Sequence, residues 1–249
     1  MLAAAGVAAA SACSPSRTTD APAYPQVAVT SAIDEIAAGW LAAYREESGP
    51  PAFELLPMPL SQAIDRAESG DLALVVSVAD PPLDWFATPL STDALAVIVH
   101  PTNAVPDLSL AELRGLFSGA IADWDELGGE ELAVQPYLPY PGDDLRVRFE
   151  AAVMGAVRVA GVAILVPHSR AAREAVAVDR SAVGLIPASM VDESVRALRL
   201  DGVLPGPSTI AGGRYPIRLP IIASAPQEPT GAVREWLVWL QESGRLPEP

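Results

Sequence analysis

The sequence has no lysine and only one cysteine, Cys13, and both features limit its chemistry. All sixteen basic residues are therefore arginines. Without lysine the chain has neither a P-loop lysine nor a Schiff-base lysine, which also excludes an ordinary pyridoxal phosphate site. A lone cysteine cannot form an internal disulfide, so the cysteine content leaves the redox compartment open.

Positive charge is scarce, because the net charge of the 249 residues is −15. Binding to a nucleic-acid backbone needs a basic stripe, and none is visible, so we expect no nucleic-acid partner. The two histidines, His100 and His168, have no Cys, Asp or Glu at metal-ligand spacing, so we expect no metal. Hydrolase, P-loop, dinucleotide and zinc-protease motifs are also missing, so we expect no enzyme and no cofactor.

Hydrophobic residues make up half of the chain, which is enough for one large domain or two lobes. From Gln26 onward, apolar strand patterns alternate with helical ones, and this order predicts an α/β fold with right-handed crossovers. Thr30 or Ser31 can cap the first helix. The expected strands are 27–29, 53–56, 72–78, 133–137, 182–186 and 195–198, and the expected helices are 31–44, 61–70, 144–154, 169–178 and 230–240.

The most informative stretch is 95–129. It opens with the apolar run 95–99, the pattern of a strand buried on both faces of a sheet. Ser109 and Glu112 then have capping-box spacing, so a helix should begin at Ser109, and Gly119 is placed to end it. A tail with the sequence FSGAIADWDELGG completes the stretch.

This stretch resembles the segment after the first hinge strand in phosphate-binding proteins of ABC importers. The family pattern there is an apolar strand, N-P, L-x-x-L-x-x-I-F-x-G and W-x-x-L-G. Two later segments also resemble the family: 182–184 matches part of its A-I-G-Y strand, and 201–219 matches its D-G-V … G-x-Y-P run. The matching positions of the first stretch are Leu110, Leu113, Phe117, Gly119, Trp124, Leu127 and Gly128.

The resemblance implies a two-lobed periplasmic-binding-protein fold of the second type with two hinge crossings. One lobe would comprise 26–97 plus 217–249, and the other 98–216. Such a protein would be an extracytoplasmic, monomeric solute-binding protein that holds phosphate or another small oxyanion between its lobes and delivers it to an ABC transporter permease.

Turns that enter helices at the carboxyl ends of strands are where an anion is expected. Three turns qualify, at 30–31, 59–61 and 141–144. In the family the third turn reads R-x-x-G-S-G-T-R-x-x-F, and here Gly142, Arg146 and Phe149 fit. Phosphate-binding members of the family usually place an Asp after the third strand to accept from a protonated phosphate, and the resemblance makes Asp80 the candidate here. The candidate ligand residues are Thr30, Ser31, Ser61, Asp80, Gly142, Asp143, Asp144 and Arg146.

The third turn departs from the pattern, because Asp143, Asp144 and Leu145 replace Ser, Gly and Thr. Two carboxylates aimed at phosphate would repel it. Asp143 and Asp144 can instead be an N-cap and a first-turn acid, just as Thr30, Ser31 and Ser61 can be plain N-caps. Two alternatives therefore stay open: a relative that has lost anion binding and acts as a sensor or adaptor, and a binder of a different, polar or cationic ligand.

The first residues, MLAAAGVAAASA, are small and apolar and lead directly to Cys13. They are too short to span a bilayer and resemble the end of a secretory signal, while 10–13 resembles a bacterial lipobox. A lipid on Cys13 would anchor the protein to a membrane, with 14–25 as a flexible tether. The alternative is a lone thiol in a tail.

Overall fold

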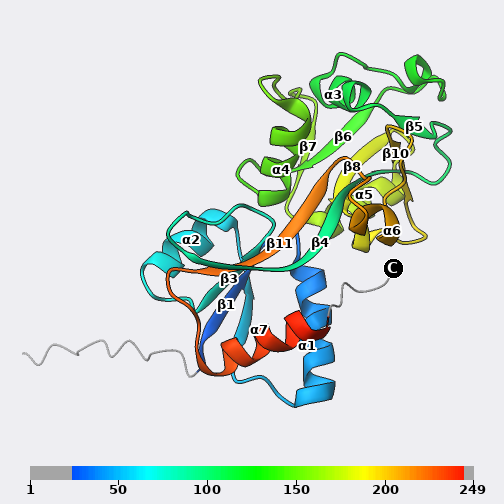
Figure 1. Ribbon diagram of the computed structural model, residues 1–249. Helices are drawn as coiled ribbons and strands as arrows, with labels where there is room; N and C mark the ends of the chain where they lie inside the picture. The colour runs from blue at the N-terminus through cyan, green and yellow to red at the C-terminus, as the bar shows by residue number, and fades with distance from the viewer. Residues whose placement is uncertain (1–23, 244–249) are drawn as a thin grey trace, which may run out of the picture.

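The computed structural model describes residues 24–243. They form two lobes joined by a pair of long strands, β4 (Phe86–Val99) and β11 (Arg218–Ala225), as Figure 1 shows. Strands and helices alternate along the chain in both lobes, so the predicted α/β architecture is confirmed. Cys13 and most of the predicted tether lie outside the described residues.

The first lobe is built on three parallel strands. The central strand β1 pairs with β2 on one side and with β3 on the other, and β11 continues the sheet antiparallel to β3. The lobe contains β1 (Gln26–Val29), α1 (Asp34–Ser48), β2 (Glu54–Pro57), α2 (Leu60–Glu68), β3 (Leu74–Ser77) and α7 (Gly231–Ser243). Helices α1 and α7 lie on the same side of this sheet in Figure 1.

Aromatic side chains fill the contact between α1, α7 and the start of β2. The rings of Phe53 and Trp236 lie 5.0 Å apart between centroids, and those of Tyr44 and Trp239 lie 5.3 Å apart at a near-perpendicular angle. Trp236 is fully buried. Each of the two helices turns an apolar face toward this contact, and that face produces the helical spacing of apolar residues in the sequence.

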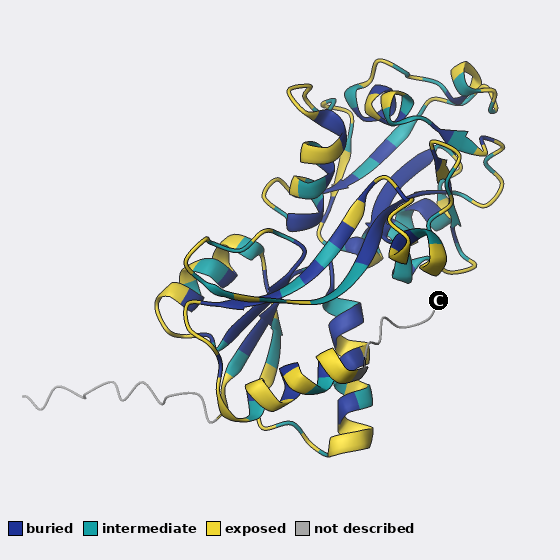
Figure 2. Cartoon of the chain, in the orientation of Figure 1, coloured by how far each residue is buried: buried dark blue, intermediate teal, exposed yellow. Residues whose placement is uncertain are grey.

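The second lobe continues the same sheet, in the order β4, β8, β6, β7. Its elements are β5 (Asp107–Leu108), α3 (Leu110–Ser118), η1 (Trp124–Leu127), β6 (Gln135–Pro139), α4 (Asp144–Phe149), η2 (Glu150–Met154), β7 (Ile164–Val166), α5 (Ser169–Val178), β8 (Ala182–Pro187), η3 (Ala188–Met190), β9 (Arg196–Ala197), β10 (Arg199–Leu200) and α6 (Pro207–Ala211). Figure 2 shows buried strands at the centre of each lobe and exposed residues on the outer faces of the helices.

The two crossing strands form one hydrogen-bonded pair. Residues 218–225 of β11 run antiparallel to 86–94 of β4, and the following residues 95–99 of β4 pair with β8. The Tyr215 hydroxyl donates a hydrogen bond of 3.0 Å to the Leu95 carbonyl, which fastens the chain entering β11 against β4. Both predicted hinge crossings are therefore adjacent strands of the same sheet.

The helix predicted at Ser109 is confirmed in detail. Ser109 is the N-cap of α3, its side chain accepts from the Glu112 N–H, and Glu112 accepts from the Ser109 N–H at 2.7 Å. Gly119 ends the helix with φ 76°, a left-handed conformation that favours glycine. The fully buried Leu108 and Leu113 lie on either side of the cap, as expected for a hydrophobic staple.

Two cap predictions are wrong. Neither Thr30 nor Ser31 caps α1, whose N-cap is Ile33 and has no side-chain hydrogen bond. Ser61 does not cap α2 either, because that helix begins at Leu60 with Pro59 as N-cap. The hydroxyls of Thr30 and Ser31 are used for contacts with the other lobe, which removes them from the helix end.

Candidate functional site

A cleft of about 370 Å³ lies between the lobes at the carboxyl ends of the first-lobe strands. This edge is where ligands bind in open α/β sheets. Both lobes contribute to its walls. The lining residues are Ser31, Asp34, Pro57, Met58, Pro59, Ser61, Tyr140, Pro141, Gly142, Asp143, Pro167 and His168.

Beside this cleft, Thr30 and Asp144 form a buried contact between the lobes. The Thr30 hydroxyl donates to Asp144 Oδ2 at 2.6 Å, and the Val78 N–H donates to the same oxygen at 2.9 Å. Thr30 follows β1 and Val78 follows β3, and these parallel strands are neighbours, so their ends present both donors at one point. Thr30 and Asp144 are each only 1% exposed.

Asp143 has two roles. It is the N-cap of α4, where its Oδ1 accepts from the Leu145 N–H at 3.0 Å and from the Arg146 N–H at 3.5 Å. Its other oxygen, Oδ2, accepts from the Ser31 hydroxyl across the cleft. The N-cap prediction for Asp143 is therefore confirmed, and Asp144 is the first-turn acid that was expected.

The carboxylates of this region are electrostatically costly. Burial and, to a smaller extent, the nearby charge of Asp143 raise the pKa of Asp144 from 3.8 to about 6, although the hydrogen bonds from Thr30 and Val78 act in the opposite direction. Burial also raises the pKa of Asp143 and of Asp34. An added anion would meet negative charge from both lobes.

The two arginines of α4, Arg146 and Arg148, bind groups that do not line the cleft. Arg146 pairs with Glu150 one turn further on at 2.7 Å and donates to the Pro139 carbonyl at 3.0 Å. Arg148 reaches the first lobe, where its Nε donates to the Val78 carbonyl at 2.6 Å and it pairs with Asp80 at 2.6 Å. Asp80 and Arg146 are not among the residues that line the cleft.

Two further candidate ligand residues, Ser61 and Gly142, line the cleft. Ser61 is in the first turn of α2 and Gly142 in the turn before α4, so they belong to different lobes. Gly142 has φ 86°, which explains the glycine in this turn. Of the eight predicted ligand residues, Ser31, Ser61, Gly142 and Asp143 line the cleft, and Thr30 and Asp144 lie beside it.

Three lining residues with polar side chains were not predicted as ligand residues: Asp34, Tyr140 and His168. His168 follows the third parallel strand of the second lobe and caps α5, since its Nδ1 accepts from the Ala171 N–H at 3.1 Å. The strand-turn-helix order at 164–169 was the available signal. It was missed because the strand lies at the end of the largely apolar segment 155–166, whose pattern does not distinguish a strand from a helix.

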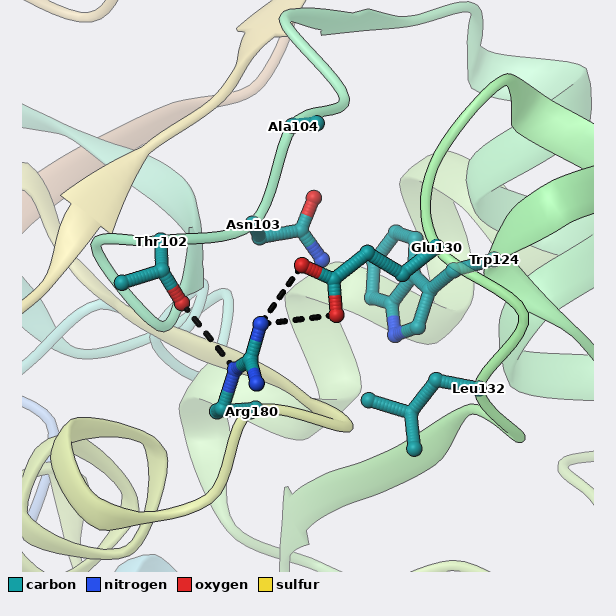
Figure 3. Close-up of a pocket in the computed structure, with 7 residues that line it drawn as sticks. All are labelled: Thr102, Asn103, Ala104, Trp124, Glu130, Leu132 and Arg180. Atoms are coloured by element: carbon teal, nitrogen blue, oxygen red, sulfur yellow. Dashed lines mark hydrogen bonds and ion pairs between the residues drawn. The ribbon is translucent and has the colours of Figure 1, made fainter.

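A smaller hollow in the second lobe contains an arginine, Arg180, that is already paired with a carboxylate (Figure 3). The Arg180 guanidinium in this hollow makes a bidentate contact with Glu130 at 2.5 and 2.7 Å and donates to Thr102 at 3.3 Å. Because its charge is neutralised within the lobe, Arg180 does not offer an anion site.

Two negative findings apply to residues 24–243. No group of three or more His, Cys, Asp or Glu side chains could hold a metal ion among them. None of the helices in this part of the chain is both long and apolar enough to cross a membrane.

Comparison with known proteins identifies the family. The family model described as the PBP superfamily domain matches residues 16–243. The phosphate-binding protein PstS of Bacillus subtilis (strain 168) is 32% identical over 149 residues, which covers 59% of this chain and 49% of the relative. The chain therefore spans about half the length of this curated relative.

Two solved structures are similar across both lobes. One is a phosphate ABC transporter substrate-binding protein with bound phosphate from Clostridium perfringens, with TM-score 0.83, 21% identity and coverage of 89% of this chain and 94% of that one. The other is an ABC-type phosphate transport receptor from Vibrio cholerae, with TM-score 0.71, 18% identity and coverage of 88% and 93%. At these identities they show the fold alone.

The chain belongs to the PBP superfamily. Its two-lobed α/β fold is the periplasmic-binding-protein type 2 fold that the resemblance implied.

Proposed function

We propose that this protein is an extracytoplasmic solute-binding protein of an ABC importer and that it takes a small oxyanion, with phosphate as the first candidate, between its lobes. The observation that carries the proposal is the donor set of Thr30 and Val78, which holds a carboxylate oxygen at 2.6 and 2.9 Å beside the cleft. Phosphate and sulfate oxygens have the same hydrogen-bond requirements as a carboxylate oxygen. Membership of the family and the names of the relatives support this assignment.

The same proposal includes the parts of the protein around the cleft. In this proposal one lobe comprises 26–97 plus 217–249 and the other comprises 98–216. The protein acts as a monomer that docks on a transporter permease. A lipid on Cys13 anchors it to the membrane through the tether 14–25. We propose no catalytic role for the protein.

A second candidate function is favoured by the position of Asp144. Its carboxylate occupies the donors that an anion would need. A relative with this arrangement can act as a sensor or adaptor without a solute, or can bind a polar cation that pairs with Asp34 and Asp143 in the cleft.

A thermal-shift screen of the full chain separates these functions. Phosphate, sulfate, molybdate, phosphonates, amino acids and small amines are tested, each over a wide concentration range. A solute present at about a hundred times its dissociation constant adds about 2.7 kcal/mol to the unfolding free energy. We expect a response to an oxyanion that is lost in Ser31→Ala and in Ser61→Ala and kept in Ser208→Ala, a change of an exposed serine on α6.

Other results reject the oxyanion. A response to amines alone assigns a cationic ligand to Asp34 and Asp143. Silence with every solute supports the sensor or adaptor function.

A further inference from the structure

We propose that the Asp144 carboxylate is a built-in ligand of the first lobe, which occupies the oxyanion position formed by Thr30 and Val78 and competes with free oxyanions for it. The inference rests on the proposed function, because it concerns the regulation of the same site.

The sheet of the first lobe holds the strand ends that carry these donors. The Thr30 backbone N–H donates to the Val76 carbonyl at 3.1 Å, and Met58 N–H donates to the Val29 carbonyl at 3.0 Å, so the ends of the strands are held by the sheet. Val78 is fully buried and Thr30 nearly so. Buried donors need an acceptor, and an acceptor that leaves must be replaced by another oxygen. The first lobe thus presents a preformed place for one anionic oxygen.

Helix α4 places Asp144 in that position. Asp143 caps the helix and fixes its first turn, which directs Asp144 at the N-terminus of the helix toward the first lobe. Arg148, about one turn later, donates to the Val78 carbonyl at 2.6 Å. The peptide groups of Val78 are therefore held by the second lobe on both sides, through the N–H by Asp144 and through the carbonyl by Arg148.

A second hydrogen bond between the lobes lies next to the one made by Asp144. The Ser31 hydroxyl donates to Asp143 directly beside it, so both hydroxyls of the turn after β1 bind carboxylates of the other lobe. A free oxyanion can use the Thr30 and Val78 donors only after Asp144 leaves them. It would also lie close to the charge of Asp143, which acts on the same position.

Calorimetric titration of the full chain with inorganic phosphate at neutral pH tests the inference. In Asp144→Ser the donors are released and one negative charge is removed, so we expect phosphate to bind about tenfold more tightly than to the unaltered chain, or better. The matched control is Asp65→Asn, which removes an exposed carboxylate on α2 and should leave the affinity unchanged. Adding Thr30→Val to Asp144→Ser should abolish the gain, because it removes one of the two donors.

The outcomes separate the inference from the proposed function. If the unaltered chain binds phosphate as tightly as Asp144→Ser does, the inference is overturned and the oxyanion function stands. If Asp144→Ser folds but gains no binding, the inference is overturned as well, and the solute screen decides the function. A gain that survives Thr30→Val also contradicts the inference, since the anion then binds elsewhere.

Small-angle X-ray scattering on the unaltered chain gives a result that does not depend on a variant folding. With a built-in ligand, the solute-free chain should scatter as the structure in Figure 1 does, with its lobes in contact, and saturating phosphate should not compact it. A solute-free chain with separated lobes that compacts when phosphate is added would overturn the inference.

Discussion

The guanidinium of Arg148 lies 2.6 Å from the carbonyl oxygen of Val78, although 70 residues separate them in the sequence. Val78 is fully buried, and Arg148 comes from the other lobe. This contact and the Thr30–Asp144 hydrogen bond join the lobes at the ends of neighbouring strands.

Removing this contact should weaken the fold. Arg148→Ala takes away a charged donor from a buried carbonyl, and we expect it to lower the unfolding free energy by about 1.5–3 kcal/mol. The measurement is urea denaturation followed by circular dichroism. The control is Asp80→Ala, which removes only the exposed ion pair with Arg148 and should cost less than about 1 kcal/mol. Equal losses in both variants would show that the Val78 contact contributes nothing.

Stability should depend on pH through Asp144. Burial raises the pKa of Asp144 from 3.8 to about 6, so between these values the folded chain binds more protons than the unfolded chain. The contribution to stability is complete below 3.8 and is lost as the pH rises through 6. The loss amounts to about 3 kcal/mol. The charged groups beside it are Asp143, the N-cap of α4, and Arg148 on α4, which binds the carbonyl of the same Val78.

The variant Asp144→Asn removes this titration. Urea denaturation should show that the stability of Asp144→Asn rises relative to that of the unaltered chain as the pH increases from 4 to 7, because only the unaltered chain loses stability over this range, which spans the two pKa values. Asp65→Asn should show no such trend. A difference between Asp144→Asn and the unaltered chain that stays constant with pH would refute the assignment of the titration to Asp144.

The strand at 182–187 should not tolerate a side chain at Gly184. A Cβ there would lie 2.9 Å from Val176 Cγ2 and 3.4 Å from Ile98 Cγ1, so Gly184→Ala overfills the contact between β8, β4 and α5. We expect a loss of about 1–3 kcal/mol in thermal or urea unfolding. In contrast, Gly39→Ala in the exposed face of α1 meets no atom within 4 Å and should stabilise by about 0.5–1 kcal/mol. A neutral Gly184→Ala would mean that α5 can shift without cost.

The sequence was informative where the determining contacts are local. Ser109 and Glu112 bond to each other three residues apart, and Asp143 bonds to the N–H groups that follow it, so both caps could be predicted. The buried strands of both lobes could be located because uninterrupted apolar runs have few alternatives to a sheet interior.

Long-range contacts were not accessible in this way. Thr30 has the chemistry of an N-cap, but its hydroxyl binds Asp144, which is 114 residues away, and no local pattern encodes that choice. The first half of β4 was also missed, because Pro89, Ser91 and Asp93 interrupt its apolar pattern and its strand conformation comes from pairing with β11. Asp93 is buried there and accepts from Ser189 of the second lobe at 2.7 Å.

The crossing between the lobes has a mechanical consequence. Residues 91–94 of β4 pair with residues 218–221 of β11. The pairing of β11 with β3 begins only at 222, and the pairing of β4 with β8 begins only at 95. The bridge is thus a short two-stranded ribbon, with a register shift between Ile221 and Ile222 at its first-lobe end. Such ribbons twist readily but resist sliding, because sliding breaks every hydrogen bond of the pair at once. We therefore expect the lobes to move relative to each other by a twist about the long axis of this ribbon and not by sliding along it.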